Sequence, residues 1–381
     1  MTQCLVVAVG IDVGTSFVKA MALDGVTVSD FARAPLPSPE LASDLWRALE
    51  DVFEAFLPGA QRRSVGAICV SGRAPTLVGI RDDQRDGPIL GWDSPGTPAG
   101  TGFYLDSIAR SLMESDRDLY DSCRFFVNPH EYLTYVLSGL VRSSTPSGLY
   151  HPWGGYVTEA TRRIRQARVD LSKVPPVVAV GSIVGRISPA SASSLGLNES
   201  TKVVMGGWDF LADVLGSGLN ASGEVLVRAG TSMAVDALWS SPISVNGFFT
   251  TPHFMPGTYV VGKIVEAATW RVKPEELDHG PMAQKPPRVR DTVLEIVGAI
   301  SRLRATIEEP PSIVCSGQRA LSTDLCRTLA KTITRPVERV DTPSAEAQGT
   351  AVLASVAAGL TSNHGEHVRA IRSNWEEIKA E

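Results

Sequence analysis

Cysteine is scarce in this chain and is not arranged for bridges or for metal. Only five of the 381 residues are cysteines, and they are scattered at positions 4, 69, 123, 315 and 326. No two of them form a CxxC pair, and no histidine stands at metal-ligand spacing from any of them. An odd, scattered set of this kind excludes a disulfide framework and a cysteine–histidine zinc site. We expect reduced, mostly buried thiols in a cytoplasmic protein.

Long apolar runs and basic clusters are also absent. No segment approaches the length of a membrane span, and the first residues do not have the pattern of a secretory leader. The formal net charge is −5, because 41 Asp and Glu outnumber 36 Lys and Arg. We therefore expect neither a nucleic-acid partner nor attachment to a membrane.

Two common phosphate-binding motifs are missing as well. The chain has no GxxxxGK[ST] sequence, which excludes a P-loop protein. The segment Gly10–Gly14 is not GxGxxG, and the residues after it continue as a strand instead of opening a helix. A dinucleotide-binding fold is therefore disfavoured.

The composition is that of a globular enzyme with more than one core. A chain of 381 residues with 43% hydrophobic and 20% charged residues is long enough for two domains. Strand-like and helix-like segments alternate along it, which predicts an α/β fold. Gly, Asn and Ser cluster between residues 218 and 223, so we place the boundary there, with domains over 1–220 and 221–381.

Helical periodicity is clearest in three segments. A helix is expected to open at Ser38 and Pro39, and another is expected over residues 290–305. The last segment, residues 368–380, also has a helical pattern and is expected to be a surface helix. The first helix is expected to bury one face, formed by Leu45, Leu49, Val52, Phe53 and Phe56.

The most informative feature is a strand–turn–strand pattern that occurs twice. A β-branched run ends in Gly14-Thr15-Ser16, and a weaker copy ends in Gly230-Thr231-Ser232, 216 residues later. Glycine lets the backbone approach an anion, and the hydroxyls and turn N–H groups can donate hydrogen bonds to phosphate oxygens. One such turn is usually an ordinary hairpin, but two of them suggest two related lobes that hold one polyphosphate.

Only the first copy carries an acidic residue, Asp12. A carboxylate at the end of a strand can hold a hydrated Mg²⁺ ion, although a solvated strand-end aspartate is the simpler alternative. Lys19, on the following strand, is either part of the same site or a solvated surface residue.

The order of landmarks along the chain resembles that of the FGGY carbohydrate kinases, within the actin-like ATPase superfamily. The resemblance covers nearly all of the N-terminal half and resumes in the last 70 residues. It rests on the two Gly-Thr-Ser turns and on the segments Val70–Pro75, Ile89–Asp93, Pro129–Gly139, Val180–Gly185, Gly206–Ala212 and Gly216–Gly218. It implies two RNase H-like domains with a cleft between them and an ATP- and Mg²⁺-dependent kinase for a sugar, ketose or polyol.

The resemblance also assigns roles to individual residues. Asp209, after Gly206-Gly207-Trp208, matches the catalytic aspartate of the family, and an ordinary helix N-cap is the alternative for a residue in this position. Asp12 matches the residue that holds Mg²⁺. The residues expected to bind the phosphates are Gly14, Thr15, Ser16, Gly230, Thr231 and Ser232.

The expected sugar site departs from the family pattern. Arg73-Ala74-Pro75 stands where many FGGY kinases carry Gln-Met-His. Trp92 and Asp93 fall where the family carries Trp-x-Asp-x-Arg, with the tryptophan shifted by one and the arginine replaced by Pro95. Trp92 and Trp208 either stack on a sugar or fill the core, and the identity of the sugar is left open.

The expected adenosine site departs further. Gly317, Gln318 and Arg319 align with the start of a Gly-Gly-Gly-Ala-x-Ser motif, so two glycines have become larger residues. Arg319 either stacks on the base or blocks the pocket. A long segment of the family before this turn is reduced here to residues 272–289. The nucleotide side is therefore trimmed, or it is completed by a partner subunit, for example in a homodimer.

Two functions are consistent with these features. The intact aspartates and both turns favour a kinase that uses ATP and Mg²⁺ on a small sugar or polyol. The altered adenosine turn and the shortened segment favour an FGGY relative that has lost turnover and binds nucleotide or sugar for regulation or assembly.

Overall fold

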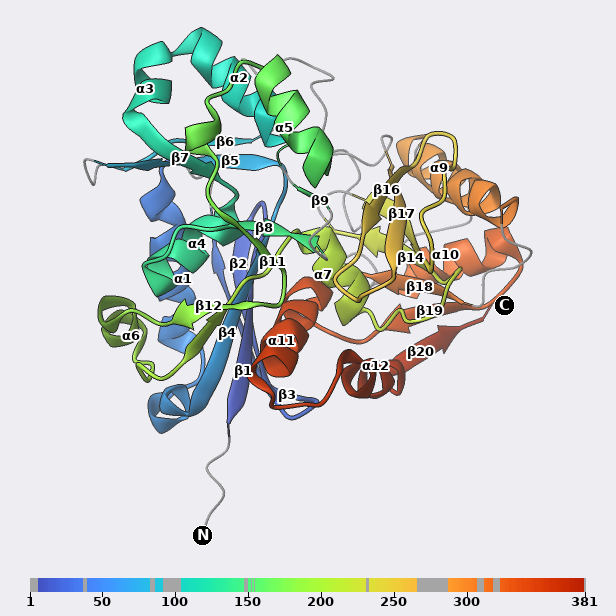
Figure 1. Ribbon diagram of the computed structural model, residues 1–381. Coiled ribbons are helices and arrows are strands. Elements are labelled where there is room, and N and C mark those ends of the chain that lie inside the picture. Colours follow the sequence, from blue (N-terminus) through green and yellow to red (C-terminus); the bar gives the residue numbers. More distant parts are fainter. Residues whose placement is uncertain are drawn as a thin grey trace. The chain divides into compact units, whose positions relative to one another are not determined.

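The computed structural model describes residues 6–36, 40–82, 86–91, 104–146, 150–151, 153, 155–230, 233–265, 287–306, 312–317 and 323–379 (Figure 1). The chain forms two compact units. The first comprises residues 1–212 and 350–362, and the second comprises residues 213–349 and 363–381. The predicted boundary between folding domains, after residue 220, stays a prediction.

The first unit is built on a six-stranded mixed sheet with the order β12-β13-β4-β1-β2-β3. β1 pairs antiparallel with β2 and parallel with β4, and β4 pairs parallel with β13. All seven residues of β1 are buried, as expected for a β-branched strand at the centre of a covered sheet. The strands are β1 (Val7–Val13), β2 (Phe17–Asp24), β3 (Thr27–Pro35), β4 (Val65–Gly72), β12 (Ile183–Arg186) and β13 (Lys202–Val204).

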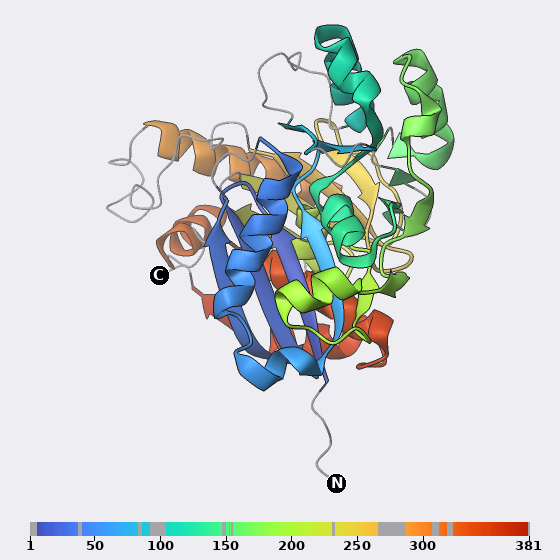
Figure 2. The same cartoon turned by 90° about the vertical axis from the view of Figure 1, so that its left-hand side faces the viewer.

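Three helices, α1 (Ala42–Ala55), α4 (Pro129–Ser138) and α6 (Pro189–Leu195), cover one face of this sheet (Figure 2). The predicted apolar face of the first helix is confirmed, because Leu45, Leu49, Val52 and Phe53 are buried in the core. The helix begins at Ala42, after the expected Ser38 and Pro39, which lie outside the described residues.

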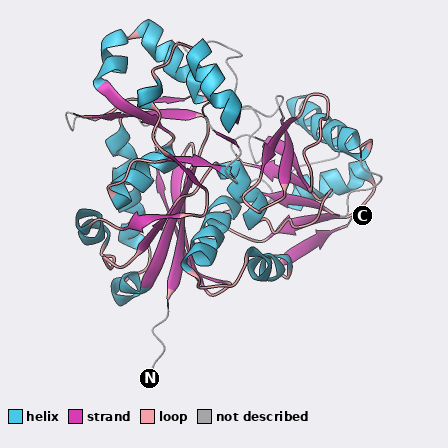
Figure 3. Ribbon diagram, in the orientation of Figure 1, coloured by secondary structure: helices cyan, strands magenta, loops and turns pink. Residues whose placement is uncertain are grey.

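A smaller layer of the first unit has its own core around Tyr120, Phe126 and Trp153 (Figure 3). Its main sheet has the order β6-β5-β7, and two-stranded pairs β11-β8 and β10-β9 accompany it. The elements are β5 (Thr76–Arg81), β6 (Ile89–Gly91), α2 (Leu105–Ser115), α3 (Arg117–Ser122), β7 (Cys123–Val127), β8 (Ser143–Thr145), β9 (Tyr150–His151), β10 (Gly155–Tyr156), α5 (Val157–Gln166) and β11 (Val177–Ala179), with short 3-10 helices η1 (Gly59–Ser64) and η3 (Leu171–Lys173).

The second unit contains a seven-stranded sheet with the order β16-β17-β15-β14-β18-β19-β20. Helices α9 and α10 pack on it and complete a core of aliphatic side chains. The elements are β14 (Val225–Ala229), β15 (Met233–Trp239), β16 (Phe249–Pro252), β17 (Tyr259–Ile264), α9 (Pro287–Arg304), β18 (Ile313–Ser316), α10 (Thr323–Ile333), β19 (Val337–Val340), α12 (His364–Arg372) and β20 (Trp375–Ile378). Helices α7 (Asp209–Gly216) and α11 (Ala345–Ala358) each contribute residues to both units.

The expected helix over residues 368–380 is wrong beyond Arg372. The chain forms helix α12 and then strand β20, which pairs antiparallel with β19. Val368, Ile371, Trp375 and Ile378 have helical spacing, but pairing with a neighbouring strand overrides this local pattern.

Among the helices that the structure describes, none is both long and apolar enough to cross a bilayer.

The two sheets share one connectivity around their central strands. β14 pairs antiparallel with β15 and parallel with β18, as β1 does with β2 and β4. In each sheet a further parallel strand follows (β19 or β13), and an antiparallel edge strand closes that side (β20 or β12). The repeated sequence pattern therefore corresponds to a repeated topology.

Candidate functional site

The carboxyl ends of three strands meet at one edge of the first sheet. The Arg73 N–H donates to the Val13 carbonyl at 3.0 Å, which joins the ends of β4 and β1. The Gly72 N–H donates to the Gly207 carbonyl at 3.1 Å, which joins β4 to the loop that follows β13. Ligands of open α/β sheets bind at this kind of edge. The structure thus brings together four predicted residues in the first unit, Asp12, Arg73, Trp208 and Asp209.

Asp12 is buried and engaged on two sides, unlike a solvated strand-end aspartate. Its side chain is 1% exposed, and the Lys19 ammonium lies 3.1 Å from Oδ2. The Ser71 hydroxyl donates to Oδ1 at 3.2 Å. Lys19 and Ser71 are the residues opposite Asp12 on β2 and β4, so the register of the sheet builds this contact. Asp12, Lys19 and Ser71 therefore form one polar cluster, the Asp12 cluster.

Asp209 is the first residue of α7, and its side chain is half-buried. The Phe210 N–H donates to Asp209 Oδ1 at 2.8 Å. The preceding carbonyl, that of Trp208, accepts from the Ala212 N–H at 3.2 Å, so Trp208 occupies the N-cap position. A negative charge is favoured at the first turn of a helix, so this position suits an acidic side chain.

The loop before Asp209 passes very close to β4. A Cβ on Gly206 would lie 1.8 Å from the Val70 carbonyl oxygen, so only glycine fits there. The indole of Trp208 stacks on Phe210 with 5.7 Å between ring centroids and is 9% exposed. The Gly206-Gly207 pair therefore holds the start of α7 against the end of β4.

The first predicted phosphate turn, Gly14-Thr15-Ser16, connects β1 to β2. The Gly14 N–H donates to the Phe17 carbonyl at 3.0 Å, and the Ser16 carbonyl accepts from the Leu36 N–H at 2.8 Å. Thr15 is half-buried and Ser16 is exposed. In the second turn only Gly230 is described, and Thr231 and Ser232 lie outside the described residues.

The predicted adenosine turn begins beside the second phosphate turn. Gly317 follows the end of β18 with a φ of +88°, a conformation that favours glycine. A Cβ on this residue would lie 2.8 Å from the Ala229 carbonyl oxygen and 3.0 Å from the Gly230 nitrogen. The two predicted nucleotide turns are therefore in backbone contact where they start. Gln318 and Arg319 lie outside the described residues.

On the predicted sugar side, Arg73-Ala74-Pro75 connects β4 to β5. Arg73 and Ala74 are half-buried, and Pro75 is buried. Trp92 and Asp93 lie outside the described residues. Only part of the predicted sugar site is thus described.

Sequence reasoning missed the polar residues that support this edge. The Thr350 hydroxyl, on α11, donates to Ser71 Oγ at 2.7 Å and so extends the Asp12 cluster by one bond. His130 packs against Gly72, because its backbone nitrogen lies 3.3 Å from where a Cβ on Gly72 would stand. Neither Ser71 nor Thr350 belongs to a distinctive motif, so only the strand register and the fold place them here.

His130 and Glu131 form a buried network at the start of α4. His130 Nε2 lies 2.9 Å from the Ser144 hydroxyl, and burial lowers the pKa of His130 to about 3. Glu131 accepts hydrogen bonds from the Asn128 and Ser144 N–H groups at 2.7 and 2.6 Å. Burial raises the pKa of Glu131, and these bonds lower it in part. The network fixes the start of α4 to strand β8.

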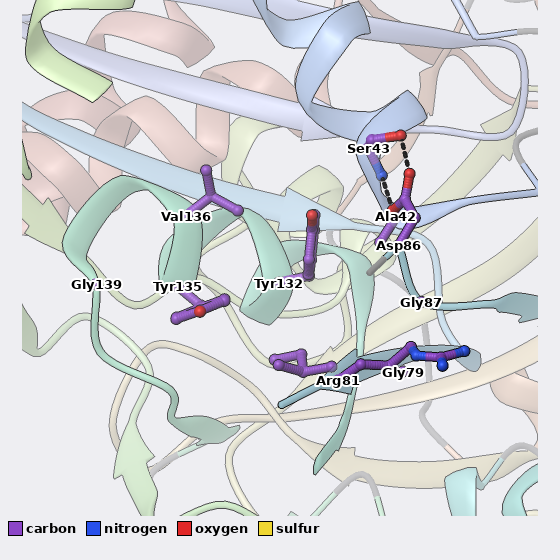
Figure 4. Close-up of a pocket in the computed structure, with 11 residues that line it drawn as sticks. Ala42, Ser43, Gly79, Arg81, Asp86, Gly87, Tyr132, Tyr135, Val136 and Gly139 are labelled. Atoms are coloured by element: carbon purple, nitrogen blue, oxygen red, sulfur yellow. Dashed lines mark hydrogen bonds between the residues drawn. The ribbon is translucent and has the colours of Figure 1, made fainter. Parts of the chain in front are cut away.

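A separate pocket of about 490 Å³ lies between α1, β5 and α4 in the first unit (Figure 4). The Ser43 N–H donates to Asp86 Oδ1 at 2.8 Å at its upper rim, and Tyr132 and Tyr135 line it from α4. No predicted site residue lines this pocket, so it is distinct from the edge formed by β1, β4 and β13.

Comparison with family models gives no match. Curated relatives, ribulokinases and xylulose kinases among them, match only part of the chain. A probable L-xylulose kinase of Pasteurella multocida (strain Pm70) is 27% identical over 189 residues, which is 48% of this chain and 39% of the relative. An autoinducer-2 kinase of Enterobacter sp. (strain 638) is 33% identical over 175 residues, which is 42% of this chain and 31% of the relative. The chain thus spans well under half the length of each of these two kinases.

Solved structures match almost the whole chain. A ligand-bound xylulose kinase from Lactobacillus acidophilus has a TM-score of 0.81 at 16% identity, covering 98% of this chain and 93% of that one. A Plasmodium falciparum glycerol kinase with ADP has a TM-score of 0.77 at 11% identity, covering 99% and 94%. The expected α/β fold of two actin-like domains is confirmed, and so is the resemblance to the FGGY carbohydrate kinases.

Proposed function

We propose that this relative of the FGGY carbohydrate kinases transfers the γ-phosphoryl group of ATP to a hydroxyl of a sugar, ketose or polyol. The observation that carries the proposal is the convergence of Asp12, Arg73 and Asp209 at the carboxyl ends of β1, β4 and β13. The names of the partial relatives, which include xylulose kinases and ribulokinases, favour a ketose as the acceptor.

Asp209 is proposed as the catalytic base. In a loose phosphoryl-transfer transition state, the attacking hydroxyl loses its proton late, so a carboxylate is a strong enough acceptor. The first turn of α7 favours a negative charge at this residue, and the half-buried position leaves part of the residue accessible. Asp209 would orient the hydroxyl and then accept its proton.

The phosphates are assigned to the turns of residues 14–16 and 230–232, with the adenosine at residues 317–319. The turn N–H and hydroxyl groups would donate to phosphate oxygens. Gly317 leaves no side chain where the two turns touch, so the backbones of the proposed phosphate and adenosine turns approach each other closely.

Asp12 is proposed to hold Mg²⁺ through water. Mg²⁺ keeps several water ligands and is usually bound by one or two carboxylates together with phosphates. A single buried carboxylate is consistent with this kind of coordination. In the part of the chain that is described, no cluster of three metal-ligating side chains occurs. When bound, the ion would neutralise charge on the β- and γ-phosphates. Lys19 and Ser71 would keep Asp12 oriented.

The second candidate is a relative that binds nucleotide or sugar without turnover. Gln318 and Arg319, in place of two glycines, and the shortened segment before them favour it. Both candidate functions use the sheet edge at the carboxyl ends of β1, β4 and β13. They differ in whether a phosphorylated product forms.

Phosphorus NMR with Mg·ATP and a panel of pentuloses, hexuloses, polyols and sugar acids tests the proposal. We expect a new phosphomonoester resonance with at least one acceptor, matched by formation of ADP. Nucleotide binding without such a resonance for any acceptor would contradict the kinase and support the second candidate.

A further inference from the structure

Asp213 is a buried carboxyl group that joins two distant parts of the second unit. It lies on α7 and is 3% exposed. Its Oδ1 atom accepts hydrogen bonds from the Ser217 hydroxyl at 2.9 Å and the Ser316 hydroxyl at 2.8 Å. Ser217 is one helical turn away, whereas Ser316 is the last residue of β18. One carboxylate oxygen therefore ties a helix to the end of a central strand.

The bond to Ser316 is made directly before the predicted adenosine turn. Ser316 stands opposite Arg228 in the parallel pair β14–β18, and Gly317 follows in contact with the Ala229–Gly230 backbone. A shift of Ser316 would therefore move the start of the adenosine turn against the start of the second phosphate turn.

The surroundings of Asp213 are charged on several sides. The pKa of Asp213 is raised to about 7: burial is the largest cause and the Glu346 carboxylate adds to it, whereas the Arg228 guanidinium and the two serine hydroxyls oppose the rise. Glu346 accepts a hydrogen bond from Ser344 at 2.7 Å, and Arg228 pairs with the buried Asp236. A buried carboxyl costs stability unless its bonds are satisfied, and perturbed groups of this kind cluster at functional sites.

We propose that Asp213, acting through the Ser316 hydroxyl, is a positioning residue for the nucleotide turn that starts at Gly317. This inference rests on the proposed use of a nucleotide by the chain. It predicts that nucleotide affinity depends on the Asp213–Ser316 bond, whereas sugar binding and the catalytic step do not. Asp213 itself touches no substrate in this account.

The two serines provide a matched pair of variants. Ser316→Ala and Ser217→Ala each remove one hydroxyl from the same carboxylate oxygen, so their structural costs are comparable. Only Ser316 is attached to the nucleotide turn. We expect Ser316→Ala to weaken binding of a fluorescent ADP analogue roughly tenfold, the scale of one lost hydrogen bond, and Ser217→Ala to change it less than about twofold.

Asp213→Asn is the second variant, because it keeps the shape and one acceptor oxygen. We expect an intermediate loss of nucleotide affinity, a raised KM for ATP, and an unchanged KM for the sugar. Equal nucleotide affinities of the Ser316→Ala and Ser217→Ala variants would overturn the inference, as would equal effects of Asp213→Asn on both KM values.

The two serine variants are compared by nucleotide binding without turnover, so the two proposals fail separately. A chain that binds nucleotide and makes no sugar phosphate contradicts the kinase but still shows the difference between the serine variants. A chain that makes sugar phosphate with equal affinities for the two serine variants retains the kinase and loses the positioning role. A chain that binds no nucleotide contradicts both.

Discussion

Asp12 is the residue whose surroundings say most about its chemistry. A carboxylate 1% exposed is retained only when it is paired, and here it has the Lys19 ammonium on Oδ2 and the Ser71 hydroxyl on Oδ1. An ion pair of this kind is compatible with two roles. Either Asp12 serves only to balance Lys19 inside the fold, or Lys19 orients a carboxylate that also receives hydrated Mg²⁺.

Two substitutions separate these roles. Asp12→Asn keeps the shape and removes the charge, so we expect Mg·ADP affinity to fall at least about tenfold while Mg²⁺-free ADP affinity changes little. Lys19→Met removes the ammonium but keeps the carboxylate and its bond from Ser71, so this variant should keep its preference for Mg·ADP over Mg²⁺-free ADP. Isothermal titration with both forms of ADP measures this. Similar behaviour of the two variants would mean that Asp12 acts only through its ion pair.

His130 is a residue-scale source of pH sensitivity. Burial lowers the pKa of His130 from 6.5 to about 3. Between these two values the imidazole is neutral in the folded protein and protonated in the unfolded chain. Its contribution to stability is therefore fully present above pH 6.5 and is lost as the pH falls below that value. His151 and His367, both with a pKa lowered to about 4 by burial, have the same sign.

His130→Gln isolates this contribution, since glutamine can still bond Ser144 but does not titrate. Between pH 7.5 and 5 we expect the free energy of unfolding of the wild-type protein to fall about 2 kcal/mol more than that of the variant. Denaturant titrations at several pH values measure the difference, and the other histidines cancel. Parallel pH curves would show that His130 is not kept neutral by the fold.

At the scale of elements, the close approach of the β13–α7 loop to β4 sets the position of Asp209. Gly206 makes this approach, because any Cβ there would overlap the Val70 carbonyl. The loop is short, so a displacement at Gly206 is carried to Trp208 and to the first turn of α7. The element, more than the single aspartate, determines where the proposed base stands.

Gly206→Ala should therefore destabilise the protein by about 3 kcal/mol or more, the upper range for overpacking. Gly298, inside α9, provides the control, since beyond its chain neighbours and the adjoining backbone of its own helix no described atom lies within 4 Å of its added Cβ. Gly298→Ala should stabilise by about 0.5–1 kcal/mol through helix propensity. Denaturant unfolding of both variants gives the comparison. A neutral Gly206→Ala variant would contradict the close packing of this loop.

Some elements can be predicted from the sequence alone, and others cannot. The buried face of α1 and the central β1–β2 hairpin follow from periodicity and β-branched runs, which are local signals. Strand β20 does not follow from a local signal. Trp375 and Ile378 fit a helical pattern, and only their pairing with β19 makes this segment a strand. The links from Asp12 to Thr350 and from Asp213 to Ser316 join residues far apart in the chain, and no local pattern encodes them.

At the scale of the whole molecule, the repeated sheet connectivity gives physical content to the two Gly-Thr-Ser turns. Each follows the central strand of its own sheet, so each stands at the carboxyl edge where open sheets bind ligands. The two copies differ in the residues beside the turn. The first copy has Asp12, and the second lies beside the proposed adenosine turn that starts at Gly317.

This difference predicts the nucleotide preference of the chain. The Gly-Thr-Ser sequence proposed to contact phosphates is present in both turns, whereas Gln318 and Arg319 stand where the FGGY pattern has glycines, at the proposed site of the base. We expect weak ATP binding and poor discrimination against GTP, because a site without a hydrogen bond to the base edge cannot reject analogues strongly. Competition of ATP, GTP and tripolyphosphate against a fluorescent nucleotide measures this. Strong preference for ATP would mean that Arg319 or its neighbours build a specific adenine site.

The proposed role of Asp209 as the base in transfer of phosphate from ATP to a sugar is tested by the Asp209→Asn variant. This substitution keeps the shape of the side chain and removes the proton acceptor. We expect sugar-dependent ATP turnover to fall by about 100-fold or more, the usual scale for a general base, while unfolding and nucleotide binding stay nearly unchanged. Turnover in the Asp209→Asn variant at the wild-type rate would contradict this role.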